Sequence, residues 1–231
     1  MMKKIMWGIS LIPFVVTGIV LQFFPDTIPM HYDLEGNIDR WGNKAEQFIL
    51  PISILIITGF WNILISHYEK KSKAASTEKE AAEAISNGKL LYIVGISQAA
   101  MFGIMHFFGL YGSYIEANTG LSHAAFDIGK ISCILGGIVF VILGNFLPKA
   151  KKNSAVGVRT AWSMYNDNTW RRSNRFGAIS LIVAGLLTIL TTIFTSGMIS
   201  TVMLIVYLII SSIITILYSK IVYEQEKKMN K

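Results

Sequence analysis

The chain has 231 residues, of which 52% are hydrophobic and only 15% are charged, and its formal net charge is +7. A water-soluble domain of this size would carry more charge, so the composition is typical of an integral membrane protein. The single cysteine, Cys133, lies in an apolar run and excludes an intrachain disulfide and a cysteine-based metal cluster.

Six apolar segments are long enough to cross a bilayer. A spanning helix needs about 20 mainly apolar residues, because each residue rises about 1.5 Å and the hydrocarbon core is about 30 Å thick. The segments run over residues 5–24, 48–66, 90–111, 128–147, 176–194 and 198–218. They are continuously apolar rather than alternating, which favours helices over the strands of a barrel. We therefore predict an all-α, polytopic membrane protein, and we expect the first segment to be a retained helix rather than a cleaved signal.

The distribution of Lys and Arg predicts the orientation. The N-terminal tail, residues 67–89, residues 148–175 and the C-terminal tail hold two, five, seven and four of these residues, 18 of the 21. Arg40 and Lys44 lie on the other side, and Lys130 lies at the outer edge of the fourth span. Because short cytoplasmic loops accumulate basic residues, we predict that both termini are cytoplasmic.

Three units follow from this layout. Residues 1–66 form a two-helix membrane unit with a structured external loop over 25–47, and residues 67–89 form a cytoplasmic linker, rich in Ala, Glu and Lys, that favours helix. Residues 90–231 form a four-helix membrane domain with a cytoplasmic loop over 148–175. Ser196 and Gly197 are nearly all that separates the last two spans, which must therefore pack as an antiparallel hairpin.

Both long loops carry unusual sequences. The external loop contains Pro25, Pro29, Gly36 and Gly42, and residues 33–37 resemble a tight turn, which indicates an ordered structure. The cytoplasmic loop alternates arginines with aromatic residues, a pattern suited to the membrane interface. Within it, residues 166–169 are typical of a turn and helix cap before the fifth span.

These two loops resemble one known family. The pattern P-D-x-I-P-x-H-Y-x-x-x-G-x-x-D-R-W-G-x-K, realised here over residues 25–44, is similar to the N-terminal domain of unknown function found in SdpI-family bacterial membrane proteins. The pattern V-G-V-R-T-x-W-S-x-x-N-x-x-T-W-R-R-S-x-R-x-G, over residues 156–177, resembles the signature of that family's C-terminal domain. The two motifs have the family's order and are both flanked by spanning segments.

The resemblance implies a function and a location. It implies a multi-pass protein of the bacterial plasma membrane that gives immunity to a secreted toxic peptide, and signal transduction by recruitment of a cytoplasmic DNA-binding repressor. The chain itself would not bind nucleic acid. The first external loop carries five acidic residues against two basic ones, a net charge of −3, which would favour a cationic peptide.

Candidate functional residues form three groups. For the external role, the resemblance points to His31, Asp39, Trp41, Gly42 and Lys44. For a cytoplasmic partner-binding surface, we select Arg159, Trp162, Trp170 and Arg171. The intramembrane polar candidates are His106, Asp127 and Lys130. Ionisable groups at such positions usually face a bundle interior or a cavity, but Asp127 and Lys130 could instead pair along one helix face, and Glu116 is expected to be solvated.

Metal binding and catalysis have little support. His31 lies near Asp33, Glu35 and Asp39, but no second nearby histidine strengthens a metal reading, so no metal or other cofactor is predicted. No catalytic triad order, phosphate loop or paired intramembrane Asp indicates an enzyme. The alternative function is a small transporter, because each half of three spans begins with a span ending in Phe-Pro or Phe-Leu-Pro and a long loop, as in an inverted repeat.

Overall fold

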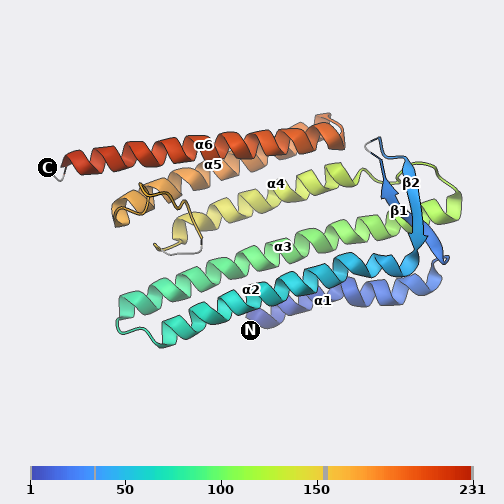
Figure 1. Cartoon of the computed structure of the whole chain (residues 1–231), viewed down its shortest axis with the longest axis horizontal. Helices are drawn as coiled ribbons and strands as arrows, with labels where there is room; N and C mark the ends of the chain where they lie inside the picture. The colour runs from blue at the N-terminus through green and yellow to red at the C-terminus, as the bar shows by residue number, and fades with distance from the viewer. Residues whose placement is uncertain (1, 34, 153–155, 230–231) are drawn as a thin grey trace.

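The computed structural model describes residues 2–33, 35–152 and 156–229. Within this part of the chain, six helices are long and apolar enough to cross a membrane, as predicted. They lie side by side and run back and forth along one axis; α6 ends at the end of the bundle opposite the strands, whereas α1 begins nearer the middle (Figure 1). The six helices are α1 (Met2–Val20), α2 (Ile49–Lys73), α3 (Glu78–Thr119), α4 (Ile128–Phe146), α5 (Asp167–Phe194) and α6 (Gly197–Met229).

Three short 3₁₀ helices and one two-stranded sheet complete the described fold. The 3₁₀ helices are η1 (Leu21–Phe23), η2 (Lys44–Phe48) and η3 (Leu147–Lys149), and the strands are β1 (Thr27–Tyr32) and β2 (Ile38–Asn43). We call the end with the strands the hairpin end, and the end with the α2–α3 turn and the last turns of α6 the loop end (Figure 1). The strands were not foreseen in the sequence, which predicted only an ordered loop with a tight turn.

The predicted linker is helical on both sides of a short turn. Residues 67–73 belong to α2 and residues 78–89 belong to α3, so that α3 reaches 42 residues. The turn ends where the Thr77 side chain accepts a hydrogen bond from the Glu80 backbone N–H, which caps the start of α3. Both helices therefore extend beyond the spans predicted from hydropathy.

The two halves of the chain follow the same order of elements. Each begins with a 19-residue helix, α1 or α4, followed by a three-residue 3₁₀ helix and a long loop. Each then ends in two packed antiparallel helices, α2 with α3 or α5 with α6. In the centre of the bundle, α4 packs against both α3 and α5 (Figure 1).

Small and hydroxyl-bearing residues hold the helices together. In lipid there is no hydrophobic drive between helices, so close packing and interhelical hydrogen bonds carry the association. Ser10 and Thr58 share a 2.7 Å hydrogen bond between α1 and α2, and Ser180 and Ser211 share one of 2.8 Å between α5 and α6. A Cβ at Gly137 would lie 2.7 Å from the carbonyl oxygen of Gly185, so α4 and α5 approach closely.

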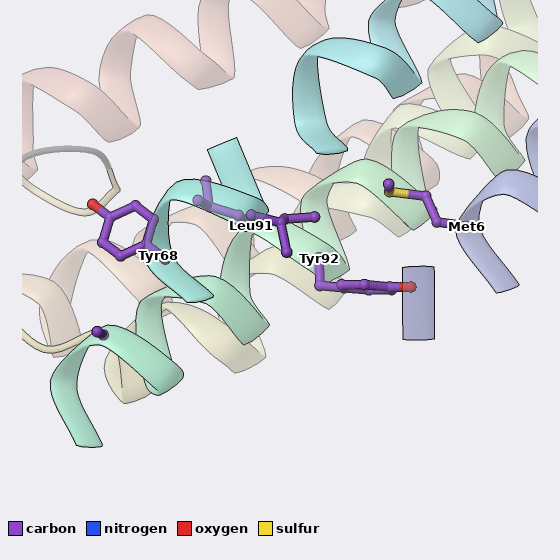
Figure 2. Packing of buried hydrophobic residues seen from close by; sticks show 6 residues of the cluster. Met6, Tyr68, Leu91 and Tyr92 are labelled. Atoms are coloured by element: carbon purple, nitrogen blue, oxygen red, sulfur yellow. The ribbon is translucent and has the colours of Figure 1, made fainter. Parts of the chain in front are cut away.

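Apolar residues are divided between an inner cluster and the outer faces. Met6, Tyr68, Leu91 and Tyr92 pack together where α1, α2 and α3 meet near the loop end (Figure 2). On α6 many large aliphatic side chains are about half exposed, Ile209 at 53% among them. Such an exposed apolar surface is expected where lipid, rather than water, surrounds the helices.

Candidate functional site

The hairpin end is built around the β1–β2 turn. The Asp33 carboxylate accepts hydrogen bonds from the backbone N–H groups of Glu35 and Asn37 and from the Asn37 side-chain amide. The Asn37 side chain contributes most to lowering the pKa of Asp33. Gly36 has a φ of +88°, which favours glycine. The tight turn predicted over residues 33–37 is thus present, with Leu34 lying outside the described residues.

The base of the hairpin is tied to the helices on either side. The Lys44 ammonium donates to the carbonyl oxygen of Phe24 at 3.0 Å and pairs with Asp26 at 3.1 Å. Asn43 and Glu46 form a reciprocal capping box at the start of η2, and Arg40 pairs with Glu46 at 3.0 Å. Lys44, one of the predicted functional residues, therefore fastens the hairpin to the end of α1.

A buried carboxylate attaches the hairpin to α3. Glu116 is only 1% exposed, and it accepts hydrogen bonds of 2.6 Å from the Tyr32 hydroxyl and from the backbone N–H of Ala125. Burial and this carboxylate raise the pKa of Tyr32, which keeps its hydroxyl protonated as the donor. The expectation that Glu116 would be solvated is wrong, because the hairpin and the α3–α4 connection fold over it.

A second polar contact supports the same junction. The Ser113 hydroxyl donates to the carbonyl oxygen of Pro29 at 3.2 Å and accepts from the Gln47 amide at 3.3 Å. Ser113 and Glu116 lie on one face of α3, three residues apart, so both meet β1. The hairpin is therefore a fixed part of the hairpin end.

Two grooves flank the connection between α3 and α4. One, of about 400 Å³, runs beneath the hairpin and is lined by Tyr32, Glu46, His106, Phe108 and Glu116 among others. The other, of about 680 Å³, lies beside the turn and is lined by Glu35, His123, Asp127 and Thr201 among others. Each groove combines acidic groups with apolar walls. Both are lined by Tyr32, Ala124, Phe126 and Ile128.

The other predicted external residues lie on the hairpin surface. His31 Nδ1 and Asp39 Oδ1 are 2.6 Å apart, and their side chains are 64% and 42% exposed. Trp41 is 48% exposed. A Cβ at Gly42 would clash with the Glu46 carboxylate and lie 2.8 Å from Met30 Cγ, so glycine is favoured there by close packing rather than by a positive φ.

The three intramembrane candidates occupy different positions. His106 is 3% exposed, bonds to the Thr17 hydroxyl of α1 at 2.7 Å and lies at the deep end of the groove beneath the hairpin. The Asp127 carboxylate accepts from the backbone N–H groups of Lys130 and Gly197, at 2.9 and 3.0 Å, which caps α4 and binds the α5–α6 connection. Asp127 thus contacts the Lys130 backbone, and the alternative of an ion pair with the Lys130 side chain is not found among the described residues.

At the loop end, the described part of residues 148–175 folds back on itself; residues 153–155 lie outside the described residues. The Ser163 hydroxyl donates to the carbonyl oxygen of Val158 at 2.6 Å, and Thr160 and Ser163 exchange hydrogen bonds. Asn166 and Thr169 form the capping box that begins α5, as predicted. Thr160, Ser163 and Thr169 thus serve the loop's own conformation.

Trp170 is the centre of this folded loop. Its side chain is 4% exposed, and its indole N–H donates to the carbonyl oxygen of Ala150 at 2.9 Å. Asn174 accepts from the Val158 backbone N–H, and Gly157, at a φ of +124°, leaves no room for a Cβ beside Asn174 and Trp170. The prediction that Trp170 faces a partner is therefore wrong, because its ring fills the space beneath the loop.

The remaining members of that predicted surface stay accessible. Arg159 is exposed and makes no hydrogen bond or ion pair with the described residues. Arg171 is exposed and donates to the Asn168 side chain at 3.1 Å. Trp162 is half-buried, with the Lys220 ammonium 5.9 Å from its ring centre. These three residues share one end of the molecule, but the structure does not bring the two arginines into contact.

Comparison with known proteins finds two partial family matches and one relative of similar length. Residues 149–219 match the SdpI/YfhL protein family, and residues 8–55 match a domain of unknown function, DUF1648. The first match contains residues 156–177, which we call the loop-end motif. The second contains the β1–β2 hairpin. The chain is therefore similar to the SdpI/YfhL family over its C-terminal part. It is 27% identical over 234 residues to the immunity protein SdpI of Bacillus subtilis (strain 168), covering 99% of both chains.

These similarities agree with the resemblance found in the two loop motifs. The structure and the comparisons together describe a multi-pass membrane protein that is similar to an immunity protein. No solved structure matches the chain.

Proposed function

We propose that this chain is a non-enzymatic immunity protein of the bacterial plasma membrane, with the hairpin end outside the cell as the charge distribution predicts. The relative of matching length is named an immunity protein, which supports the class of function. The hairpin end supports the mode of action, because it is the part of the described chain that combines an ordered outer surface with two grooves.

The charge of this surface favours a cationic partner. Glu46 and Glu116 line the groove beneath the hairpin, and Asp33, Glu35 and Asp127 line the groove beside the turn. Arg40 is the basic residue that lines the first groove, and it is paired with Glu46. Acidic grooves attract cationic peptides before contact, and their apolar walls offer burial to aliphatic or aromatic side chains.

The main support for the proposal is that the hairpin is held in a fixed position over the first groove. Tyr32, Glu116 and Ala125 hold the hairpin against α3 and the α3–α4 connection through 2.6 Å hydrogen bonds. A preorganised surface does not have to be ordered when a ligand arrives, which favours binding of a peptide from outside. The groove would then remove the peptide from the lipid it attacks.

The test is survival of a toxin-sensitive strain that expresses this chain. The native chain should raise survival on exposure to the toxic peptide. A variant with Glu35→Gln, Asp39→Asn and Glu46→Gln should lose most of that protection at equal membrane abundance. The matched control, Glu224→Gln near the end of α6, should keep it. Protection that is unchanged in the triple variant would exclude the acidic surface from the function.

A signalling role at the opposite end would use Arg159, Arg171 and Trp162. Arg offers a planar fork of five donors that can bind a carboxylate in bidentate fashion, and Arg159 is exposed without a partner among the described residues. These features support contact with a cytoplasmic repressor. Trp170 would support that surface from below.

The second candidate function is transport of a small solute. The observation that favours it is the shared order of elements in the two halves, together with a groove that leads to the buried His106. A transporter should show solute-dependent flux in sealed vesicles, whereas an immunity protein should protect cells without moving any solute.

A further inference from the structure

The groove beneath the hairpin follows one side of α3. Its lining includes Met105, Gly109, Gly112 and Glu116, which recur every three or four positions and therefore share one face of the helix. From Met105 to Glu116 the groove extends for roughly 16 Å, since a helix rises about 1.5 Å per residue. Ile49 at the start of α2 also lines it.

The groove crosses from the membrane surface into the apolar part of the bundle. Glu46 and Glu116, in its outer part next to the hairpin, lie outside the spans predicted from hydropathy. Ile49, Met105 and Gly109, which line its inner part, lie within those spans. The groove thus matches a molecule that carries a polar or charged group beside an apolar segment.

The inner part of the groove opens toward lipid. Its floor belongs to α3, which lies between α2 and α4 and packs against both (Figure 1). Two apolar lining residues, Ile49 of α2 and Phe108 of α3, are 63% and 37% exposed. Because both belong to predicted spans, their exposed surface meets lipid rather than water. A molecule dissolved in the bilayer can therefore enter the groove from the side, without passing the hairpin.

The middle of the groove contains empty space at Gly109. A Cβ at Gly109 would meet no atom within 4 Å, whereas a Cβ at Gly112 would already lie 3.4 Å from Glu116 and from Phe126. A side chain larger than glycine's can therefore occupy the space at position 109 without displacing its neighbours. The same space is available to an apolar side chain of a bound molecule.

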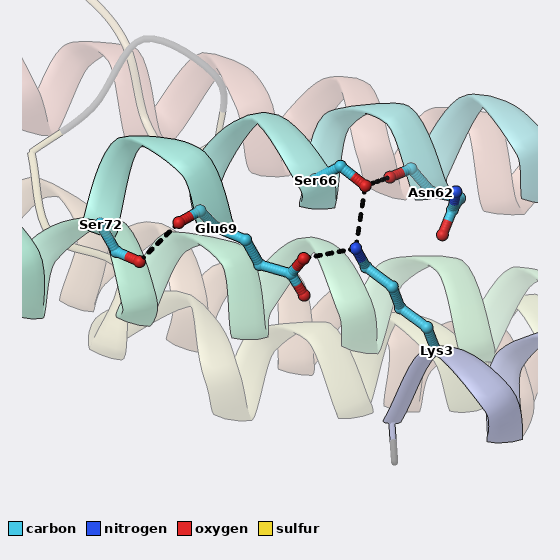
Figure 3. A network of polar contacts seen from close by, with 5 residues as sticks. All are labelled: Lys3, Asn62, Ser66, Glu69 and Ser72. Carbon is cyan, nitrogen blue, oxygen red and sulfur yellow. Dashed lines mark hydrogen bonds and ion pairs between the residues drawn. The ribbon is translucent and has the colours of Figure 1, made fainter. Parts of the chain in front are cut away.

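The buried carboxylate in the wall of the groove lacks a basic partner. Glu116 is 1% exposed, and its partners are the Tyr32 hydroxyl and the Ala125 backbone N–H, both neutral donors. None of the ion pairs among the described residues includes Glu116. The acid Glu69, near the loop end, differs because the Lys3 ammonium pairs with it (Figure 3). A buried charge without a counter-charge is unfavourable, and its field acts over several ångströms, so Glu116 favours a cation in the outer part of the groove.

We propose that the groove takes its peptide from the membrane and not from water. An apolar segment enters from the side between α2 and α4 and packs at Gly109, against Ile49 and Phe108. A lysine or arginine next to that segment lies in the outer part, within the field of Glu116. The inference rests on the proposed function, to which it adds the route of entry and the chemical class of the peptide.

The test is photo-cross-linking in phosphatidylcholine vesicles that contain the purified full-length protein. The probe is a synthetic peptide of two lysines followed by a leucine-rich segment, in which one leucine carries a diazirine. Cross-links should form at residues 105–112 of α3. In Gly109→Leu their yield should fall by about tenfold, the effect of excluding one well-packed apolar side chain. The matched control is Gly59→Leu in α2, where a Cβ also meets no atom within 4 Å, and it should keep the native yield.

A second probe needs no variant of the protein. With glutamines in place of the two lysines, the peptide should cross-link to the native chain several-fold less. An unchanged yield in Gly109→Leu, or equal yields with the two probes, would overturn the proposal. A photoreactive phosphatidylcholine that labels residues 105–112 and is not displaced by the lysine peptide would make lipid the occupant and would also overturn it.

Survival of a toxin-sensitive strain separates this proposal from the proposed function. A native chain that gives no protection would contradict the proposed function itself. Protection by the native chain that persists in Gly109→Leu, at equal membrane abundance, would contradict only the role of the groove. Protection that is lost in Gly109→Leu and kept in Gly59→Leu is the result we expect.

Discussion

The hairpin and the loop-end motif use similar residues in opposite ways. Both contain tryptophan, arginine, asparagine and glycine in a polar run between spans, and both are folded. Trp41 of the hairpin is 48% exposed, whereas Trp170 of the loop-end motif is 4% exposed and hydrogen-bonded to Ala150. A motif rich in aromatic and polar residues can therefore form either an exposed surface available for binding or a buried structural contact, and the exposure of its side chains distinguishes the two.

The largest expected effect is on the stability of the loop end. Trp170→Ala removes a buried ring and leaves the Ala150 carbonyl without its donor, which should lower the free energy of unfolding by roughly 3–5 kcal/mol. Trp41→Ala, at an exposed position, should change it by less than about 0.5 kcal/mol. Unfolding of both purified variants in mixed micelles measures the difference, and equal losses would remove the contrast between the two regions.

The next largest effect concerns the junction of the hairpin with α3. Glu116→Gln leaves either the Tyr32 hydroxyl or the Ala125 backbone N–H without an acceptor, which should lower the free energy of unfolding by about 1–3 kcal/mol. It should also reduce the survival of cells exposed to the toxic peptide. Tyr32→Phe should have a similar effect, and the double variant should cost less than the sum of the two. Additive losses in a double-mutant cycle would mean that Tyr32 and Glu116 act separately.

Much of the fold could be predicted because apolar length alone determines where a chain crosses a bilayer. The six spans and the cap at Asn166 follow from such local rules. The two strands could not be predicted by such rules, because Pro29 and Gly42 lie inside them and both residues normally count against strand structure. Glu116 was missed because an acid near a helix end is usually solvated, and only the fold brings Tyr32 to it, 84 residues away in sequence.

Two glycine substitutions should change the free energy of unfolding with opposite signs, the first by as much as Glu116→Gln. Gly42→Ala should destabilise the hairpin by about 1–3 kcal/mol, because the new Cβ would displace Glu46 and Met30. Gly59→Ala in α2, where nothing lies within 4 Å of the new Cβ, should instead stabilise the chain by up to about 1 kcal/mol. Thermal unfolding of the two variants tests the signs, and a neutral Gly42→Ala would contradict the close packing.

The smallest expected change in stability is at the exposed arginines of the loop end. Arg159→Lys and Arg171→Lys should each alter the free energy of unfolding by less than about 0.5 kcal/mol. Neither should change the survival of cells exposed to the toxic peptide. If a repressor binds there through the guanidinium fork, a repressor-controlled reporter should lose its response. Lys228→Arg is the matched control. A normal reporter response in both variants would leave these arginines with a lipid-facing role only.

The central claim is that the hairpin end faces outward and that its grooves bind the toxic peptide. The most direct measurement is the labelling rate of single cysteines in intact cells by an impermeant thiol reagent, in a Cys133→Ser background. Ala124→Cys lines both grooves, Asn118→Cys is exposed outside them, and Ser76→Cys lies in the turn at the opposite end. We predict that the first two are labelled, that Ser76→Cys is protected, and that the peptide slows labelling at Ala124→Cys alone. Labelling of Ser76→Cys in intact cells, or equal slowing at Asn118→Cys and Ala124→Cys, would contradict the account.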